Sequence, residues 1–336
     1  MVFPPLRTGL GLGLGGAPLG NLFAAISDDD AQAVLCAALA DGCRSIDTAP
    51  HYGHGLSEHR IGRAVRNLGR DAFALSSKVG RVLRPDAAAA RDQHGYINVL
   101  PFTQHWDYSA AGVRRSVFDS LQRLGLARLD AVYVHDCDAG VHGAAYPQIL
   151  RQLLGETLPE LERLRGEGLL RHIGLGVNDV QVCLDVLAHA DLDCLLLAGR
   201  YSLIDQSALS ALLPVCVGRG VRIALGGVFN SGILATGVRG RSAPLFNYAA
   251  ASQAWVDKVA GIETVCEEFG VPLRAAALQF PLAHPSIEIV MVGAQTVAHW
   301  RDAVAMLGHP IGTGFWEALR ARGLLDACAP TPGYAP

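Results

Sequence analysis

The sequence predicts a closed (β/α)8 barrel, and three observations favour that fold. Short apolar or β-branched runs alternate with longer stretches of helical spacing, in eight successive units. No composition shift and no Pro/Ser-rich linker divides the 336 residues, so we expect one domain over 1–336. Hydrophobic residues make up 50% of the chain, enough for a large core. Eight units without a linker are typical of a TIM barrel rather than of two doubly wound halves.

The expected strands are the short apolar runs between turn residues. They lie at 10–14, 43–47, 72–78, 130–135, 171–177, 194–199, 221–227 and 287–293. The first contains Gly11 and Gly13, which with Gly16 spell a GxGxxG pattern. A dinucleotide fingerprint of that form opens a helix directly, whereas here Pro18 follows and the first helix begins only near Asp29. A glycine-rich barrel strand is therefore the better interpretation.

The expected helices keep apolar residues on one face. They lie at 29–40, 57–67, 109–124, 147–165, 180–189, 207–217, 251–268 and 297–307. Some ends carry capping signals: Ser57 and Ser109 are expected N-caps, and Gly125 is expected to end the third helix. Two long connections, at about 79–108 and 136–147, interrupt the regular alternation, and a Pro-rich tail at about 329–336 is expected to be loose.

Charge and cysteine content exclude several classes of protein. The formal net charge is −3, whereas nucleic-acid binding usually needs a basic surplus. The eight cysteines are scattered without a CxxC pair, so we expect no metal site and reduced, mostly buried thiols. No apolar run reaches the roughly 18 residues of a membrane span, and the N-terminus is not a convincing signal peptide. We expect a cytoplasmic protein without membrane or nucleic-acid partners; the oligomeric state stays open.

Polar residues stand where the predicted strands end, which is where a barrel builds its active site. Asp47, Lys78 and His135 end three consecutive strands, and Asn178 and Tyr201 follow the next two. Singly, an aspartate at a strand end is more often a cap or turn residue, and a lysine or histidine there is as often structural as functional. An acid, an amine and an imidazole on neighbouring strands are much less often accidental, because adjacent strands lie about 5 Å apart.

Tyr52 lies in the turn after Asp47 and completes a set suited to proton transfer. A free phenol titrates near pH 10, too high for acid–base work at neutrality. A nearby Lys78 ammonium would lower that pKa, Asp47 would keep the ammonium charged, and an imidazole would hydrogen-bond the substrate oxygen. These groups predict chemistry at a carbonyl or hydroxyl group.

At these positions the chain resembles the aldo/keto reductases, and the resemblance covers nearly its whole length. The similar segments are IDTAPHYGHGLSEHRIG from residue 46, LSSKVG from 75, SAAGVRRSVFDSLQRLGLARLDAVYVHD from 109, HIGLGVN from 172, RYSLID from 200 and EIVMVGA from 288. Within the family, the sequence is most similar to the D-threo-aldose 1-dehydrogenase branch, which includes fucose, galactose and pyridoxal dehydrogenases.

The resemblance implies NAD(P)-dependent hydride transfer and gives roles to matching positions. Tyr52 becomes the general acid/base, Lys78 depresses its pKa, Asp47 pairs with Lys78, and His135 orients the substrate oxygen. Tyr201 is expected to stack beneath the nicotinamide, and Asn178 to bind its carboxamide; an ordinary aromatic and a helix N-cap are the respective alternatives. The segment 17–21 is expected to border the nicotinamide.

Two glycine-rich loops after the last two strands are expected to hold the coenzyme phosphates. The cofactor-binding residues expected in and beside these loops are Gly227, Phe229, Asn230, Ser231, Gly232, Leu234, Gly293, Gln295, Thr296, His299 and Asp302. Of these, Asp302 is expected to accept a hydrogen bond from the adenine amine. Gln295 and His299 stand where NADP-preferring relatives carry Ser, Lys or Arg, and Ala303 replaces the usual Asn at the adenine. The sequence therefore favours NAD over NADP, with the nearby Arg301 as the feature that argues the other way.

The long connections are expected to shape the substrate pocket. Candidate substrate-binding residues are His51, Trp106 and Asp136, with Tyr96, Phe102 and Gln104 nearby. We expect oxidation of the anomeric hydroxyl of an aldose to a lactone. Two alternatives are turnover of another small carbonyl compound, such as an aromatic aldehyde or pyridoxal, and a nicotinamide-binding redox sensor with little turnover.

Overall fold

Eight parallel strands close into a barrel, as predicted. The computed structural model describes residues 11–240 and 244–333. Neighbouring strands follow the order β1-β12-β9-β8-β7-β6-β3-β2, and β2 returns to β1. The strands are β1 (Leu12–Gly15), β2 (Ser45–Asp47), β3 (Ala74–Val79), β6 (Leu129–His135), β7 (Leu170–Val177), β8 (Cys194–Ala198), β9 (Arg222–Gly226) and β12 (Ile287–Gly293).

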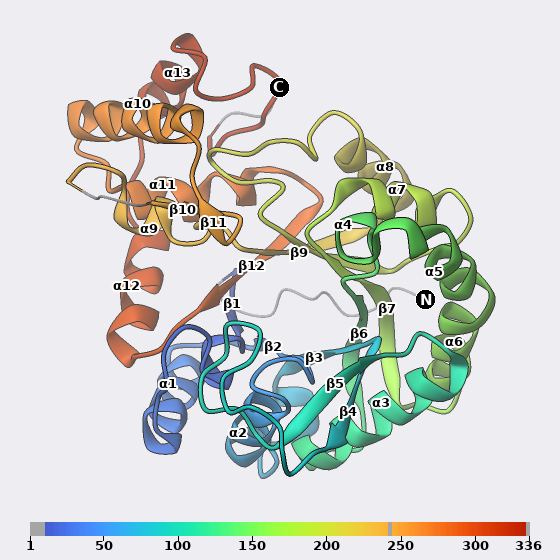
Figure 1. Cartoon of the computed structure of the whole chain (residues 1–336). Coiled ribbons are helices and arrows are strands. Elements are labelled where there is room, and N and C mark those ends of the chain that lie inside the picture. Colours follow the sequence, from blue (N-terminus) through green and yellow to red (C-terminus); the bar gives the residue numbers. More distant parts are fainter. Residues whose placement is uncertain (1–10, 241–243, 334–336) are drawn as a thin grey trace.

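Helices surround the barrel and cover its outer face (Figure 1). The α-helices are α1 (Asp28–Ala40), α2 (Leu56–Val65), α3 (Ala110–Leu124), α4 (Ala139–His142), α5 (Tyr146–Gln152), α6 (Leu158–Gly166), α7 (Val180–Leu187), α8 (Leu212–Arg219), α9 (Ile233–Thr236), α10 (Gln253–Phe269), α11 (Leu273–Gln279), α12 (Val297–Leu307) and α13 (Thr313–Ala321). A π-helical segment over Leu153–Thr157 joins α5 to α6, so the predicted helix at 147–165 is one nearly continuous element. No helix within the described residues is long and apolar enough to cross a membrane.

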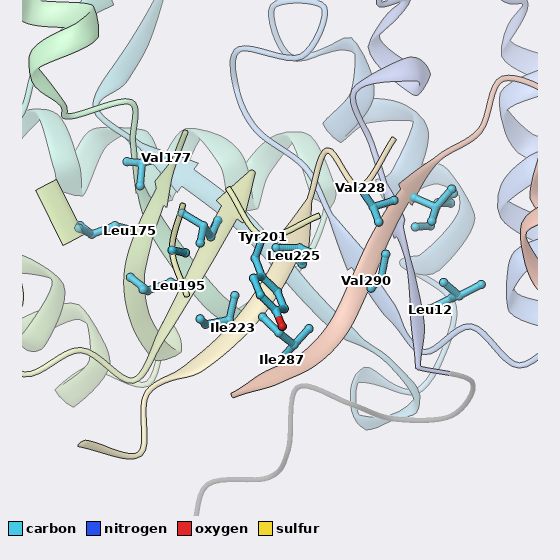
Figure 2. Close-up of a cluster of buried hydrophobic side chains, with 14 of the residues drawn as sticks. Leu12, Leu175, Val177, Leu195, Tyr201, Ile223, Leu225, Val228, Ile287 and Val290 are labelled. Carbon is cyan, nitrogen blue, oxygen red and sulfur yellow. The ribbon is translucent and has the colours of Figure 1, made fainter. Parts of the chain in front are cut away.

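The side chains of the strands alternate between two apolar cores. One set lies between the barrel wall and the helices, where Figure 2 shows Leu175, Leu195 and Val290 among other buried side chains. The other set fills the barrel interior and consists of Ala131, Tyr133, Cys194, Leu196, Ala224, Ile289 and Met291. Protein cores of this kind are close-packed, so the strands are held rigidly beneath whatever lies at their ends.

The last inward position of each strand forms the top layer of the barrel. Three of these positions are polar, namely Asp47, Lys78 and His135. The other five carry small residues: Gly15, Gly176, Ala198, Gly226 and Gly293. The register places Gly15 beside Asp47 on one side and Gly293 on the other. One half of the barrel mouth therefore carries ionisable side chains, and the other half consists of backbone with almost no side chains. We call the second part the bare half.

Helix-capping predictions were partly correct. Ser109 caps α3 by accepting a hydrogen bond from the amide of Gly112 at 3.1 Å, and Gly125 ends the helix with φ +67°. Ser57 is not an N-cap, because α2 begins earlier and Gly55 holds the cap position at φ +94°. The Ser57 hydroxyl instead donates to the carbonyl of Gly16 at 2.8 Å. This contact ties α2 to the segment that follows β1.

Several elements were missed by the sequence analysis. The connection at 79–108 contains an antiparallel hairpin of β4 (Arg81–Pro85) and β5 (Phe102–Trp106), and the connection after β9 contains β10 (Leu245–Phe246) and β11 (Ala249–Ala250). Helices α11 and α13 were also not predicted. β4 and β5 mix apolar residues with charged or polar ones, and β10 and β11 are only two residues long, so the apolar periodicity that predicts strands is weak or absent in them.

The C-terminal tail is held more firmly than expected over its first residues. Ala329 and Thr331 are buried, and Arg320 donates hydrogen bonds to the Ala329 carbonyl at 2.7 Å and the Thr331 hydroxyl at 2.9 Å. The prediction of a loose segment is therefore wrong for these positions, because an arginine on α13 pairs with them. Residues 334–336 lie outside the described part of the chain.

Candidate active site

A cavity of about 620 Å³ opens above the top layer of the barrel. It brings together all four predicted catalytic residues, since Asp47, Tyr52, Lys78 and His135 all line it. Further lining residues come from the segment after β1, the loop after β3, the ends of β7, β8, β9 and β12, and the β10–β11 turn. They include Gly15, Ala17, Pro18, Leu22, Phe23, His51, His94, Tyr96, Asp136, Gly176, Asn178, Ala198, Gly226, Gly227, Tyr248, Met291 and Gly293.

Lys78 and Asp47 form a buried ion pair on the polar side of the cavity. The Lys78 ammonium donates to Asp47 Oδ2 at 2.6 Å and to the Thr48 carbonyl at 2.9 Å, while the Ser76 hydroxyl donates to Asp47 Oδ1 at 2.7 Å. Burial raises the pKa of the Asp47 carboxyl, and the Lys78 charge opposes that rise. The pair is fully hydrogen-bonded, as buried charges must be.

Tyr52 is held above this pair by a tight turn. Its amide donates to the Ala49 carbonyl at 3.1 Å, and Gly53 follows with φ +67°. The Lys78 Nζ lies 4.7 Å from the centre of the Tyr52 ring, while Tyr96 stacks on the ring with centroids 6.0 Å apart. The His135 ring meets Tyr52 edge-on at 6.2 Å. The four predicted groups are therefore mutual neighbours.

The electrostatics of Tyr52 differ from the expectation. Burial raises the pKa of the Tyr52 phenol well above its ordinary value, and the Asp47 carboxylate adds to the rise. The predicted lowering of the Tyr52 pKa by Lys78 is not found, because the Asp47 carboxylate lies 2.6 Å from the Lys78 ammonium and offsets its charge. At neutral pH Tyr52 is thus protonated, which suits a proton donor to an oxygen that develops negative charge.

The imidazoles of the cavity are neutral at physiological pH. Burial lowers the pKa of His135 well below its ordinary value, helped by Arg81 and Lys78, and burial with Arg81 lowers the pKa of His51 to about 2. His51 Nδ1 lies 2.8 Å from Gln104 Oε1, and His135 Nδ1 is buried without a hydrogen-bond partner among the described residues. Neutral imidazoles hydrogen-bond a substrate oxygen without adding charge.

The neutral His51 predicts a pH-dependent stability. Its folded pKa lies below the unfolded value of about 6.5, so below that pH the unfolded chain binds a proton that the folded chain does not. Stability is therefore lost as the pH falls. Between pH 7 and pH 5, His51→Gln should lose about 2 kcal/mol less unfolding free energy than the unmodified protein. Urea unfolding at both pH values measures this, and equal losses in both proteins would contradict the assignment.

Asn178 lies at the cavity, and its alternative role is taken by its neighbour. Helix α7 is capped by Asp179, whose carboxylate accepts from the Val182 amide at 2.8 Å. The carbonyl of Asn178 accepts from Arg200 Nε at 2.6 Å, which fixes its backbone. The exposed side chain is therefore not used as a helix cap, and binding of a carboxamide there remains a prediction.

Tyr201 does not reach the cavity, and its predicted stacking role is wrong. Its side chain is fully buried, with ring centroids 5.2 Å from Phe280 and 5.5 Å from His284. Figure 2 shows the ring among Ile223 and Ile287. Gly199, with φ +68°, turns the chain away at the end of β8. Tyr201 is therefore a core aromatic outside the barrel wall.

The two predicted phosphate loops lie beside the cavity, but only parts of them line it. Gly227 and Gly293 face the cavity directly. In the first loop, Asn230, Ser231 and Gly232 have φ of 44°, 59° and 97°, while Leu234 is fully buried and faces the core. Within this left-handed run the amide of Asn230 donates to the Gly227 carbonyl at 2.8 Å, and the amide of Gly232 donates to the carbonyl of the partly buried Phe229 at 3.0 Å. Contact of these residues with a coenzyme remains a prediction.

In the second loop, most side chains already have protein partners. Thr296 caps α12 by accepting from the His299 amide at 3.1 Å, and Gln295 Nε2 donates to the Leu22 carbonyl at 3.1 Å. Asp302 accepts two hydrogen bonds from Arg274, at 2.8 and 3.0 Å. That ion pair competes with the predicted contact between Asp302 and an adenine amine.

The bare half of the barrel mouth fits a flat ring. A Cβ atom on Gly226 would meet only ordinary contacts, the nearest being Ala198 Cβ at 3.5 Å, and on Gly15 the nearest atom would be 3.7 Å away. Neither position has a positive φ, so neither packing nor backbone strain requires glycine there. Both residues line the cavity, and a side chain would fill it. The small residues leave room for a bound group such as a nicotinamide.

Gly226→Ala is therefore expected to weaken coenzyme binding without weakening the fold. The added methyl group projects into the ring site, so we expect the Kd for NADH to rise about tenfold, with the melting temperature unchanged or slightly raised. Fluorescence titration and thermal unfolding measure both. Gly174→Ala is the contrasting control, because its Cβ would lie 2.1 Å from the Cys194 carbonyl and should destabilise the protein. Unchanged affinity in Gly226→Ala would place the ring elsewhere.

The predicted substrate residues separate into two groups. His51 and Asp136 line the cavity, as expected. Trp106 does not: it lies on β5, 43% exposed, and carries the Arg81 guanidinium 4.0 Å above its ring. It supports the cavity wall from behind. Trp106 as a direct substrate contact is therefore wrong in this structure.

Other lining residues were missed because the connections that carry them have no periodicity. Phe23 and Tyr248 face each other at 6.4 Å, both with positive φ and both more than half exposed. His94 and Leu22 join them at the rim. Clustered Gly, His and Asn residues mark these segments as loops, but nothing local predicts which side chain turns inward. In the described parts of the chain, no group of His, Cys, Asp and Glu could hold a metal ion.

Comparison with known proteins confirms the resemblance. Residues 11–322 match the aldo/keto reductase family. The chain is 40% identical to pyridoxal 4-dehydrogenase of Microbacterium luteolum over 95% of this chain and 96% of that one, and 37% identical to D-threo-aldose 1-dehydrogenase of a Pseudomonas species over 96% and 95%. Its fold is similar to the holo form of an aldo-keto reductase from Bacillus halodurans, with a TM-score of 0.70 and 22% identity over 95% and 93% of the chains. The chain therefore belongs to the aldo/keto reductase family of NAD(P)-dependent oxidoreductases.

Proposed function

We propose that the protein oxidises the anomeric hydroxyl of a neutral aldose to a lactone with NAD⁺. The observation that carries the proposal is the cavity itself, in which Tyr52, His135 and the Lys78–Asp47 pair stand opposite a bare half lined by Gly15, Gly226 and Gly293. Polar groups from the long connections, His51 and Asp136, border the same cavity. The 37% identity to a D-threo-aldose 1-dehydrogenase supports this substrate class.

Side chains of the protein transfer the proton of the substrate hydroxyl. In the oxidative direction the ionised form of Tyr52 accepts the proton of the anomeric hydroxyl while the C1–H bond breaks, and in the reductive direction the protonated phenol returns it. Because burial keeps the phenol protonated at neutral pH, its ionised fraction carries the oxidation. Neutral His135 hydrogen-bonds the same oxygen and orients it. The Lys78–Asp47 pair supplies a fixed dipole beneath the phenol, in a buried setting where such dipoles act strongly. A nicotinamide coenzyme would supply the hydride acceptor in the oxidative direction. Asn178 and the glycine-rich loops would hold its carboxamide and phosphates.

NAD is proposed as the preferred coenzyme. The 2′-phosphate of NADP would need cationic partners. The residues at the expected positions are the neutral Gln295 and exposed His299, while Arg274 is already paired with Asp302. Arg301 lies 3.8 Å from Asp41 and is mostly exposed, so it is the remaining cation on this helix. We expect kcat/KM to be higher with NAD⁺ than with NADP⁺.

Pyridoxal is a second candidate substrate, favoured by the aromatic lining of the cavity. Tyr52, Tyr96 and Tyr248 all line it. Pyridoxal also closes into a cyclic hemiacetal, so the same proton and hydride transfers apply to it. The 40% identity to a pyridoxal 4-dehydrogenase supports this reading.

A steady-state panel tests these proposals. NADH formation at 340 nm would be followed with L-fucose, D-galactose, pyridoxal and benzyl alcohol, each with NAD⁺ and with NADP⁺. We expect L-fucose or D-galactose to give the highest kcat/KM, with NAD⁺. A preference for pyridoxal would replace the aldose proposal with the second candidate. No turnover of any compound in either direction would reject both and favour a coenzyme-binding sensor.

A further inference from the structure

Asp136 has a strained backbone that is held in place from several sides. It is a non-glycine residue with φ +46°, directly after His135. Its amide donates to the Gly176 carbonyl at 3.0 Å, and its own carbonyl lies 3.2 Å from the Tyr108 hydroxyl and 3.1 Å from His142 Nε2. Such strain persists only where the surroundings enforce it, and it is typical of functional positions. The strain aims the side chain into the cavity.

The Asp136 carboxylate is anchored through one oxygen. Arg81 Nη2 donates to Oδ2 at 2.5 Å, and His135 Nε2 lies 3.5 Å from the same atom. Within the described residues, no protein group donates a hydrogen bond to Oδ1, and the side chain keeps 21% of its surface exposed. A fixed carboxylate that lines the cavity therefore keeps one oxygen available to a ligand, next to the imidazole that is expected to meet the reacting oxygen.

Arg81 is itself fixed by the β4–β5 hairpin. The register pairs Arg81 with Trp106, whose ring lies 4.0 Å under the guanidinium. Arg81 Nη1 also donates to Gln104 Oε1 at 3.3 Å, and Gln104 holds His51. Arg81 does not line the cavity, so it positions the carboxylate from behind. The β4–β5 hairpin, supported by the Trp106 ring, therefore positions the Asp136 carboxylate.

The charged residues that line the cavity favour a neutral substrate over an anionic one. Among the described residues that line the cavity, Lys78 is the one Lys or Arg, and Asp47 offsets it. A substrate that carries its own negative charge would meet the Asp136 carboxylate without an unpaired cation from these residues. A neutral substrate with a hydroxyl next to the reacting carbon would donate to that carboxylate, and a charged acceptor makes a strong hydrogen bond.

We propose that Asp136, positioned by Arg81, is the specificity-determining residue that reads a hydroxyl on the carbon next to the reacting carbon. The protein therefore selects neutral polyhydroxy substrates over deoxy and anionic ones. This inference rests on the proposed aldose oxidation and goes beyond it by naming the group on the substrate and the pair of residues that recognise it.

The test compares L-fucose with 2-deoxy-L-fucose, using the ratio of their kcat/KM values. Because a ratio cancels general damage to the enzyme, it reports recognition of the hydroxyl alone. We expect a ratio of about 10 to 100 in the unmodified protein, since loss of a hydrogen bond to a charged group costs that much. In Asp136→Gly the ratio should fall toward 1, and glycine tolerates the positive φ. Asp136→Asn should give an intermediate value.

Variants of the β4–β5 hairpin distinguish positioning of the Asp136 carboxylate by Arg81 from a general effect on folding. Arg81→Gln should lower the ratio, and Arg81→Lys should restore part of it. Arg84→Gln removes an exposed cation from the same strand and should leave the ratio unchanged. A ratio near 1 in the unmodified protein, or an unaltered ratio in Asp136→Gly, would overturn the inference. Absence of turnover with both sugars would instead show that the proposed function itself has failed.

Discussion

Tyr52→Phe is expected to lower kcat by about 10³- to 10⁴-fold while the protein still binds NADH. The substitution removes one hydroxyl from a ring that is held by its turn, by Tyr96 and by Lys78, so the ring itself should stay in place. General acid–base catalysis typically contributes a factor of this size. Steady-state kinetics, NADH fluorescence and thermal unfolding together check the three parts of the expectation.

Tyr96→Phe is the matched control for this experiment. Tyr96 is 3% exposed, lines the same cavity and stacks on Tyr52. The substitution therefore removes a hydroxyl from the same surroundings. We expect kcat to change less than about tenfold, because Tyr96 is not placed to exchange a proton with the substrate. If Tyr52→Phe kept more than a tenth of the original kcat, the acid–base role of Tyr52 would be refuted.

Lys78→Met is expected to damage both stability and activity. Methionine fills the space of the lysine stem but leaves the Asp47 carboxylate buried without its 2.6 Å partner. Removing one member of a buried pair costs about 3–5 kcal/mol. The loss of the ammonium also removes the fixed dipole beneath Tyr52, so turnover should fall by at least about 100-fold. Urea unfolding and kinetics measure the two effects separately.

The double variant Asp47→Asn/Lys78→Met distinguishes the two losses. Removing the carboxylate charge as well should restore most of the lost stability, because no uncompensated charge remains buried. Activity should stay low, since neither charged group remains near the phenol. Recovery of turnover along with stability would show that Lys78 acts through the fold alone.

The fold was predictable because its signal is distributed over the whole chain. Each barrel strand is a short apolar run whose inward and outward residues both find a core, as in the sequence around Tyr133 and Val134. The polar strand ends were predictable for the same reason, since Asp47, Lys78 and His135 interrupt apolar runs at one edge of the barrel. Their closeness follows from strand adjacency.

The errors arose where tertiary packing overrides local sequence. Tyr201 follows a strand just as Asn178 does, but a left-handed glycine turns it into the outer core. Trp106 was predicted to bind the substrate, yet pairing with Arg81 across the hairpin places it behind the cavity wall. The pKa of Tyr52 depends on burial and on the charge balance of a neighbouring pair. None of these properties is encoded within a few residues of the position concerned.

Transfer of deuterium from the anomeric carbon of the sugar to the coenzyme tests the central claim most directly. The protein would be mixed with NAD⁺ and L-fucose deuterated at C1, and the reduced coenzyme analysed by mass spectrometry. Our account predicts that the reduced nicotinamide carries the deuterium, and that Tyr52→Phe abolishes its formation. Reduced coenzyme without deuterium, or equal labelling by the Tyr52→Phe variant, would contradict hydride transfer coupled to a proton held by Tyr52.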